Sequence, residues 1–213
     1  MMLFQDRADA GWQLAKPLTH YQNQNPIVLA LPRGGVPVGF EVAKVLNAPL
    51  DIILVRKLGV PNQPELAMGA IASGGVRVLN HEIVRSLNIP DQVIEQVTTK
   101  EQQELMRRDR LYRGDRPAMD VRDRIVILVD DGLATGSTMQ AAVTAVKQQQ
   151  PAQIVVAVPL AVSEVCDRFQ QQVDEVVCLM SPEPFHAVGL WYKDFSQTAD
   201  QEVQKLLQEA VCA

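Results

Sequence analysis

Two adjacent carboxylates, followed by a stretch rich in glycine and hydroxyl side chains, offer the clearest chemistry in this sequence. Asp130 and Asp131 come directly after the apolar run 125–129, and residues 132–138 contain two glycines and three hydroxyl side chains. Carboxylates suit ribose hydroxyls or a hydrated Mg²⁺ ion, and the free backbone N–H groups of such a loop suit a phosphate. The stretch therefore predicts a site for a ligand that has both hydroxyl groups and phosphate.

The flanking residues indicate how these groups are positioned. Residues 125–129 form an uninterrupted apolar run, which is typical of a strand buried on both faces. Residues 139–150 have a helix-forming composition. Strand, loop and helix in this order would bring the loop to the carboxyl edge of a parallel sheet, where the helix dipole favours an anion.

The Asp-Asp-Gly sequence has two simpler interpretations. A strand that ends in an acidic turn would need no ligand, since such turns are common. The acidic strand of a P-loop ATPase would require a Gly-x-x-x-x-Gly-Lys-Ser/Thr motif, and no glycine in the chain is followed by Lys-Ser or Lys-Thr. The length of the motif in its strand and helix context argues against a plain turn.

A second glycine-rich turn follows another apolar run. Residues 27–31 are apolar, Pro32-Arg33-Gly34-Gly35 comes next, and residues 36–46 are predicted to be helical. A tight turn in which glycine provides a positive φ is the simplest explanation. A second loop of the phosphate-binding kind in one small domain favours a site instead, and a cation at Arg33 suits pyrophosphate.

Residues 129–138, Val-Asp-Asp-Gly-Leu-Ala-Thr-Gly-Ser-Thr, resemble the loop of type I phosphoribosyltransferases that binds 5-phosphoribosyl 1-pyrophosphate (PRPP). The resemblance implies that Asp130 and Asp131 are the catalytic acids and hold the 2′ and 3′ hydroxyls of the ribose. It also implies a set of residues around the 5′-phosphate: Ala134, Thr135, Gly136, Ser137 and Thr138. Mg²⁺ would be the cofactor, carried by PRPP and bridged by water to the two acids, with no metal held directly by the protein.

The same resemblance assigns the second loop to pyrophosphate. Arg33, Gly34 and Gly35 would contact the leaving group through backbone amides and the cationic side chain. A cis or otherwise strained peptide bond is expected near Arg33, stabilised by the surrounding turn.

A basic pair, Arg56 and Lys57, follows a third predicted strand at residues 52–55. Orotate phosphoribosyltransferases have an Arg-Lys pair after the equivalent strand, so the resemblance implies that both cations bind pyrophosphate. We expect them at the carboxyl edge of the parallel sheet, facing the same crevice as the two loops. A solvated basic pair at a strand end is the alternative. Beyond it, residues 76–79 are predicted to return as the far arm of a hairpin.

Residues 80–122 are charged and lack a continuous apolar stripe. A helix is predicted over residues 91–113, where Glu104 and Arg108 are spaced to pair, but its apolar stripe breaks over residues 98–104. A charged surface helix is one interpretation. Type I phosphoribosyltransferases have a mobile loop in this position, so the resemblance favours a lid whose arginines reach the pyrophosphate on closure.

The C-terminal part completes the alternation of strands and helices. Strands are predicted at 154–158 and 175–179, and helices at 162–171 and 196–209. Aromatic side chains crowd the region before the last helix: Phe185, Trp191, Tyr192 and Phe195. In the family this flanking segment forms a hood over the acceptor, which makes residues 181–213 the expected hood. Aromatics that only fasten the C-terminus to the core are the alternative.

The bulk properties limit the class of protein. A chain of 213 residues with 47% hydrophobic content suits one domain, residues 1–213. A net charge of −5 predicts no nucleic acid and no anionic membrane as partner. The three cysteines are too far apart for a zinc pattern, and no signal peptide or long apolar span is present, so reduced thiols and a cytoplasmic location are expected.

These patterns together predict an α/β fold with a mostly parallel sheet, helices on both faces, a lid insertion at 80–122 and a small C-terminal hood. The resemblance implies a phosphoribosyltransferase that moves the 5-phosphoribosyl group of PRPP to a nitrogenous, nucleobase-like acceptor and releases pyrophosphate. Its partners would be PRPP and a small-molecule acceptor, and a homodimer is left open. Ala134 stands where hypoxanthine-guanine enzymes have an aspartate, which disfavours a 6-oxopurine. The competing interpretation is a non-catalytic PRPP-binding sensor.

Overall fold

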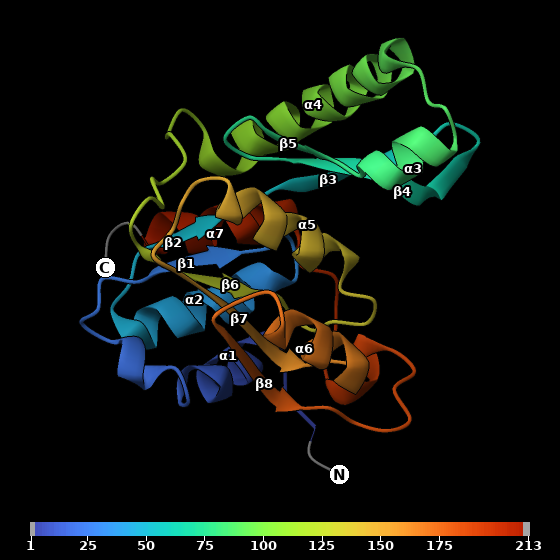
Figure 1. Ribbon diagram of the computed structural model, residues 1–213. Coiled ribbons are helices and arrows are strands. Elements are labelled where there is room, and N and C mark those ends of the chain that lie inside the picture. The colour runs from blue at the N-terminus through green and yellow to red at the C-terminus, as the bar shows by residue number, and fades with distance from the viewer. Residues whose placement is uncertain (1–2, 211–213) are drawn as a thin grey trace.

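A five-stranded parallel sheet forms the centre of the computed structural model, which describes residues 3–210 apart from the side chains of Pro64 and Glu65. The strands are β1 (Ile27–Ala30), β2 (Leu50–Ile52), β6 (Ile125–Val129), β7 (Gln153–Leu160) and β8 (Glu175–Met180). They lie in the order β2-β1-β6-β7-β8, and each neighbouring pair is parallel (Figure 1). The strands that precede the two predicted loops, β1 and β6, are therefore neighbours.

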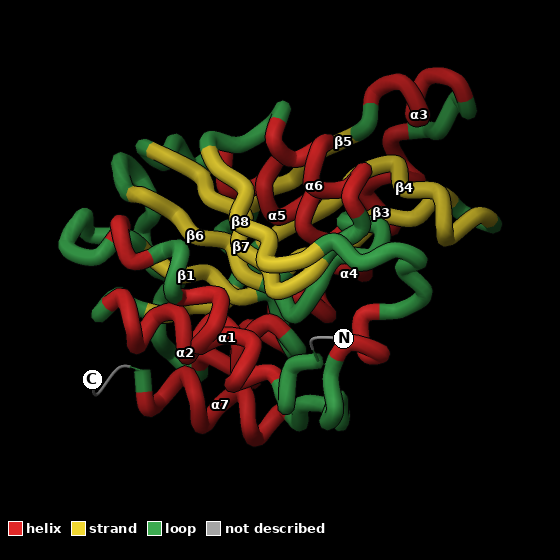
Figure 2. Tube along the Cα trace, turned by 90° about the horizontal axis from the view of Figure 1, so that it is seen from below, coloured by secondary structure: helices red, strands yellow, loops and turns green. Residues whose placement is uncertain are grey.

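Helices cover both faces of this sheet (Figure 2). One face is covered by α1 (Arg7–Ala15), α2 (Gly35–Leu46) and α7 (Asp200–Glu209), and the other by α5 (Ser137–Lys147) and α6 (Ser163–Gln170). Alternate residues of β6 point to opposite cores, Ile127 and Val129 to the first and Val126 and Leu128 to the second. The arrangement confirms the predicted α/β fold.

The chain between β2 and β6 forms an insertion. Its elements are an antiparallel sheet of β3 (Val55–Val60), β4 (Gln63–Ala72) and β5 (Val76–Leu79), then α3 (His81–Ser86) and α4 (Asp91–Arg113). The hairpin of β4 and β5 and the helix at 91–113 agree with the predictions. Leu58, Met68 and Ile94 are buried in the same cluster as the first core of the main sheet. The insertion therefore shares a core with the rest of the domain.

The prediction of a single strand over residues 52–55 is wrong. β2 ends at Ile52 and β3 begins at Val55, and the two belong to different sheets. The N–H of Ile53 still donates to Ala30 in the main sheet (3.0 Å), whereas the N–H of Ser73 in the insertion donates to the carbonyl of Leu54 (2.9 Å). The sequence does not reveal this change of partner, because both sheets bury the same kinds of apolar residue.

The two ends of the described chain pack against each other. The N–H of Phe4 donates to Trp191 in the short 3-10 helix η2 (Val188–Trp191) at 3.0 Å, and the N–H of Lys193 donates back to Phe4 at 2.8 Å. The ring of Tyr192 lies 5.3 Å from that of Phe4 and 5.0 Å from that of Phe195, measured between centroids. These contacts agree with the alternative in which the aromatics fasten the C-terminal segment. Residues 211–213 of the predicted hood lie outside the described residues.

A buried ion pair joins the insertion to the main sheet. Arg113 at the end of α4 is 5% exposed and Asp51 in β2 is 6% exposed. Nε of Arg113 donates to Oδ1 of Asp51 at 2.8 Å, and the N–H of Met119 donates to Oδ2 at 3.1 Å. Arg113 also donates to the carbonyl of Ile52 and to Asp109. Removal of Arg113 would leave the carboxylate of Asp51 buried without a cation.

We expect Arg113→Leu to destabilise the protein by about 3–5 kcal/mol, because Asp51 would remain buried without its cation. Urea unfolding followed by circular dichroism measures the change. Lys205→Ala is the control, since the pair between Lys205 and Glu209 is exposed and should contribute little. Equal unfolding midpoints for Arg113→Leu and the wild type would contradict this account of the junction.

Candidate active site

The two predicted loops touch each other at the carboxyl ends of β1 and β6. A Cβ atom on Gly34 would lie 2.0 Å from Oδ2 of Asp131, and one on Gly35 would lie 2.7 Å from the carbonyl oxygen of Val129. No real side chain can approach so closely, so glycine is required for this contact. The structure thus brings together two motifs that lie about a hundred residues apart in the sequence.

The loop at residues 134–138 is open to solvent at the start of α5. Ala134, Thr135, Ser137 and Thr138 are exposed, whereas Gly136 is buried with φ +71°. The N–H groups in the first turn of a helix have no partner within the helix, so they point towards this open loop. The loop has the geometry expected of an anion site.

The opposite side of the loop is supported by α6. Nη2 of Arg168 donates to the carbonyl of Thr135 at 2.6 Å, and a Cβ on Gly136 would lie within 3.0 Å of Val165, Phe169 and Arg168. The N–H of Leu133 also donates to Leu160 at the end of β7 (2.9 Å). The loop is fixed from behind while its front stays accessible.

The two acids lie side by side in a poorly solvated position. Oδ1 of Asp130 accepts a hydrogen bond from the N–H of Asp131 at 2.9 Å. Burial raises the pKa of Asp130 well above its usual range, and the charge of Asp131 raises it further. Burial also raises the pKa of Asp131, although the hydrogen bond and charge of Arg7 oppose that rise. Ionised carboxylates here require a compensating partner.

Sequence reasoning missed Arg7, the partner of Asp131. Nε of Arg7 donates to Oδ2 of Asp131 at 2.8 Å and Nη1 donates to the carbonyl of Ser196 at 2.7 Å. Its guanidinium carbon lies 3.9 Å from the centre of the Phe195 ring. The Tyr192 hydroxyl donates to the carbonyl of Asp131 at 2.6 Å. Arg7 precedes Asp131 by 124 residues and belongs to no motif, so no local signal could have revealed the contact.

A cationic cavity of about 220 Å³ lies beside the second loop. Its lining residues are Pro32, Arg33, Arg107, Arg108, Tyr112 and Asp200. The peptide bond between Pro32 and Arg33 is cis, which confirms the prediction of unusual geometry there. Arg107 and Arg108 both donate to Glu104 and lower the pKa of its carboxyl to about 2. The lining of the cavity thus contains three arginines and one aspartate.

The predicted position of Arg56 and Lys57 needs correction. Both residues lie within β3 of the antiparallel sheet, and not in a loop at the edge of the parallel sheet. Neighbouring residues of a strand point to opposite faces. Arg56 lines a narrow space together with Pro32 and Thr138 and donates to Glu101 at 2.8 Å, while Lys57 is exposed. Arg56 thus adjoins both loops, whereas the side chain of Lys57 points to the opposite face of β3.

The family of phosphoribosyl transferase domains matches residues 7–183 of the chain, which include both loops and both acids. The chain belongs to the phosphoribosyltransferase family. The membership confirms the family resemblance that residues 129–138 indicated.

Individual relatives agree with this assignment. Two Mycobacterium tuberculosis proteins, from strains CDC 1551 and H37Rv and provisionally named phosphoribosyl transferases, are each 48% identical over 210 residues. The match covers 99% of this chain and 47% of each relative, so the chain spans about half the length of these curated relatives.

Solved structures share the fold. The crystal structure of TT1426 from Thermus thermophilus has a TM-score of 0.89 at 42% identity, covering 98% of this chain and 99% of that chain. AQ2163 from Aquifex aeolicus, with a TM-score of 0.51 at 12% identity, covers 94% of this chain and 84% of that chain, and shows the fold alone. Within residues 3–210, no helix is both long and apolar enough to span a bilayer.

Proposed function

We propose that this phosphoribosyltransferase transfers the 5-phosphoribosyl group of PRPP to a nitrogen atom of a small heterocyclic acceptor and releases pyrophosphate. The observation that carries the proposal is the contact of the two loops. It brings Asp131 against Gly34, next to the cavity that is lined by three arginines, and the open loop at residues 134–138 directly follows the two acids. PRPP has a phosphate, two ribose hydroxyls and a pyrophosphate, which are one group for each of these three features.

The proposed reaction needs little covalent chemistry from the protein. The bond between C1′ of the ribose and the acceptor nitrogen forms while the bond between C1′ and the pyrophosphate oxygen breaks. Positive charge develops on the ribose and negative charge on the leaving group. We propose that Asp130 and Asp131 stabilise the first charge, and that Arg33, Arg107 and Arg108, which line one cavity, stabilise the second.

The donor set fits Mg²⁺ that arrives with PRPP. Among the described residues, no group of three or more His, Cys, Asp or Glu side chains could hold a metal ion. Asp130 and Asp131 provide two neighbouring carboxylates, which can accept hydrogen bonds from water bound to the ion. When bound, Mg²⁺ supplies charge stabilisation to the pyrophosphate.

Two features of the site bear on the class of the acceptor, the side chain at position 134 and the segment that covers Gly132. Ala134 has no carboxylate to accept a proton from a 6-oxopurine ring, so we propose a different nitrogen heterocycle. Val188 of η2 covers Gly132, with its methyl groups within 3.0 Å of a Cβ placed there. We therefore propose that the segment 181–199 borders the acceptor, in keeping with a hood.

Asp131→Asn should weaken PRPP binding in the presence of Mg²⁺ by about 1.5–3 kcal/mol, because a charged hydrogen-bond acceptor is lost. Titration calorimetry measures the affinity. Asp123→Asn, which removes an exposed charge at the opposite end of β6, is the matched control and should bind PRPP as the wild type does. Equal affinities for wild type and Asp131→Asn would refute the assignment of the ribose site.

An acceptor screen separates the enzyme from a PRPP sensor. Nitrogen heterocycles are offered with PRPP and Mg²⁺, and release of pyrophosphate is recorded. An enzyme releases pyrophosphate with at least one acceptor class. A sensor binds PRPP and turns over with none.

Arg33→Gln should weaken pyrophosphate binding by roughly 1–2 kcal/mol, below the value for a fully buried charged hydrogen bond, because the Arg33 side chain is 34% exposed. Calorimetry with pyrophosphate and Mg²⁺ provides the measurement. Arg110→Gln is the control, since Arg110 is exposed on α4 and does not line the cavity. If both variants bind pyrophosphate like the wild type, the leaving group lies elsewhere.

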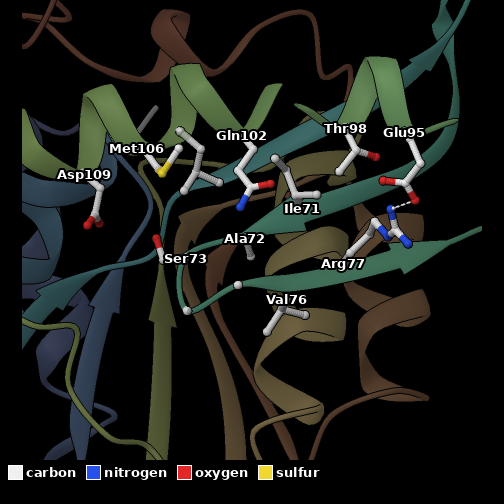
Figure 3. A pocket seen from close by; sticks show the side chains of 13 residues that line it. Ile71, Ala72, Ser73, Val76, Arg77, Glu95, Thr98, Gln102, Met106 and Asp109 are labelled. Atoms are coloured by element: carbon white, nitrogen blue, oxygen red, sulfur yellow. Dashed lines mark hydrogen bonds and ion pairs between the residues drawn. The ribbon is translucent and has the colours of Figure 1, made fainter. Parts of the chain in front are cut away.

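We propose that the segment 80–122 acts as the lid of this site. α3 has no buried residues, and a cavity of about 380 Å³ separates the middle of α4 from the turn between β4 and β5. Figure 3 shows Gln102, Met106 and Asp109 of α4 around this cavity, with the ion pair of Arg77 and Glu95 at one end. Ile94, Leu105 and Arg113 anchor α4 to the domain, so we propose that the motion is greatest in α3, which can open at low free-energy cost.

PRPP with Mg²⁺ should slow hydrogen exchange in α3 and α4, because the arginines of α4 would be held by the bound polyanion. Mass spectrometry of peptides from residues 80–122 measures the change, and peptides from β8 serve as the internal reference. Amides of the segment that are already protected in the free protein, and unchanged by PRPP, would identify a fixed structural helix.

A further inference from the structure

We propose that Arg7 is a positioning residue for the reaction, which fixes Asp131 so that Oδ1 of its carboxylate stays free to accept a ribose hydroxyl. The inference rests on the proposed function. Arg7 would not contact the ribose itself and would act through Asp131.

Three contacts fix the plane of the Arg7 guanidinium. Nε binds Oδ2 of Asp131, Nη1 binds the carbonyl of Ser196, and the ring of Phe195 stacks against the guanidinium carbon. The side chains of Arg7 and Asp131 are only 12% and 15% exposed. A lysine could supply the charge but not the planar pair of donors. The contact therefore fixes an orientation of the carboxylate as well as neutralising it.

Arg7 also adjoins the pyrophosphate loop. Its Nε would lie 3.2 Å from a Cβ on Gly34, the same position that would collide with Oδ2 of Asp131. The side chain thus lies where the ribose acids, the pyrophosphate loop and the C-terminal segment meet. A displaced Asp131 carboxylate would intrude on the pyrophosphate loop, so Arg7 keeps both loops in register.

The hydrogen bond and the charge of Arg7 favour the ionised form of Asp131. The charge of Asp131 raises the pKa of Asp130, which follows β6. The Tyr192 phenol from the C-terminal segment stays neutral, since burial and the charge of Asp131 raise its pKa. Arg7, from α1, opposes the effect of burial on Asp131. Without Arg7 the pKa of Asp131 rises further, and the ionised acceptor is populated only at higher pH.

The test is calorimetry of PRPP binding with Mg²⁺ at several pH values from mildly acidic to alkaline, on wild type, Arg7→Gln and Arg7→Lys. Arg7→Gln should bind PRPP about 10- to 100-fold more weakly at neutral pH, and the deficit should shrink as the pH rises. Arg7→Lys should fall between the two, because charge is kept and orientation is lost. Titration of the PRPP phosphates is common to all three proteins and cancels in the comparison.

Arg124→Gln is the matched control. Arg124 also bridges distant segments, by donating to the carbonyls of Asn25 and Pro26, but it does so near the amino end of β6. It should leave the PRPP affinity and its pH profile unchanged.

Three results are decisive. PRPP affinities of both Arg7 variants equal to that of the wild type at every pH would overturn the inference and leave the proposed function intact. A deficit that does not change with pH would show a structural role alone and would also overturn it. A wild-type protein that does not bind PRPP would overturn the proposed function and this inference with it. Should Arg7→Gln fail to fold, a PRPP affinity of Arg7→Lys equal to that of the wild type at every pH would overturn the inference, and a weaker affinity of Arg7→Lys would support it.

Discussion

The close approach of two backbone loops is the constraint on which the rest of the site depends. β1 and β6 pair in parallel, with Ala30 opposite Val129, and the N–H of Leu31 donates to Val129 at 2.9 Å beyond the paired residues. Both chains therefore leave the sheet at the same edge and in contact. Gly34 and Gly35 allow that contact because they place no atom where the acids lie. The cavity beside Arg33 and the open loop at residues 134–138 both adjoin this junction.

The parts of the fold that could be predicted are those determined by residues close together in the sequence. The apolar run of β6 marks a strand buried on both faces, and the glycines of the two loops mark turns at helix starts. The charge pattern of residues 91–113 defined α4 to the residue. Each of these signals depends on a contiguous stretch and on the periodicity of its side chains.

The parts that could not be predicted depend on contacts between distant segments. Arg7 resembles any other arginine on an amphipathic helix until α1 is packed beside Asp131. The break between β2 and β3 is hidden because Ile53 and Leu54 are both apolar, although one bonds to the main sheet and the other to Ser73. The prediction that Arg56 and Lys57 face one crevice was wrong for the same reason. Both residues lie in β3 of the antiparallel sheet, where consecutive side chains point to opposite faces.

The contact between α1 and the segment before α7 affects when the site can form during synthesis. Arg7 is made well before Phe195 and Ser196, and all three meet beside Asp131. A nascent chain that has released only the strands and the two loops lacks the groups that hold this guanidinium in place. Such contacts between distant parts of a sequence form late, because the loop between Arg7 and Ser196 spans 189 residues. The cation that neutralises Asp131 is thus held in place only after residues 195 and 196 have been made.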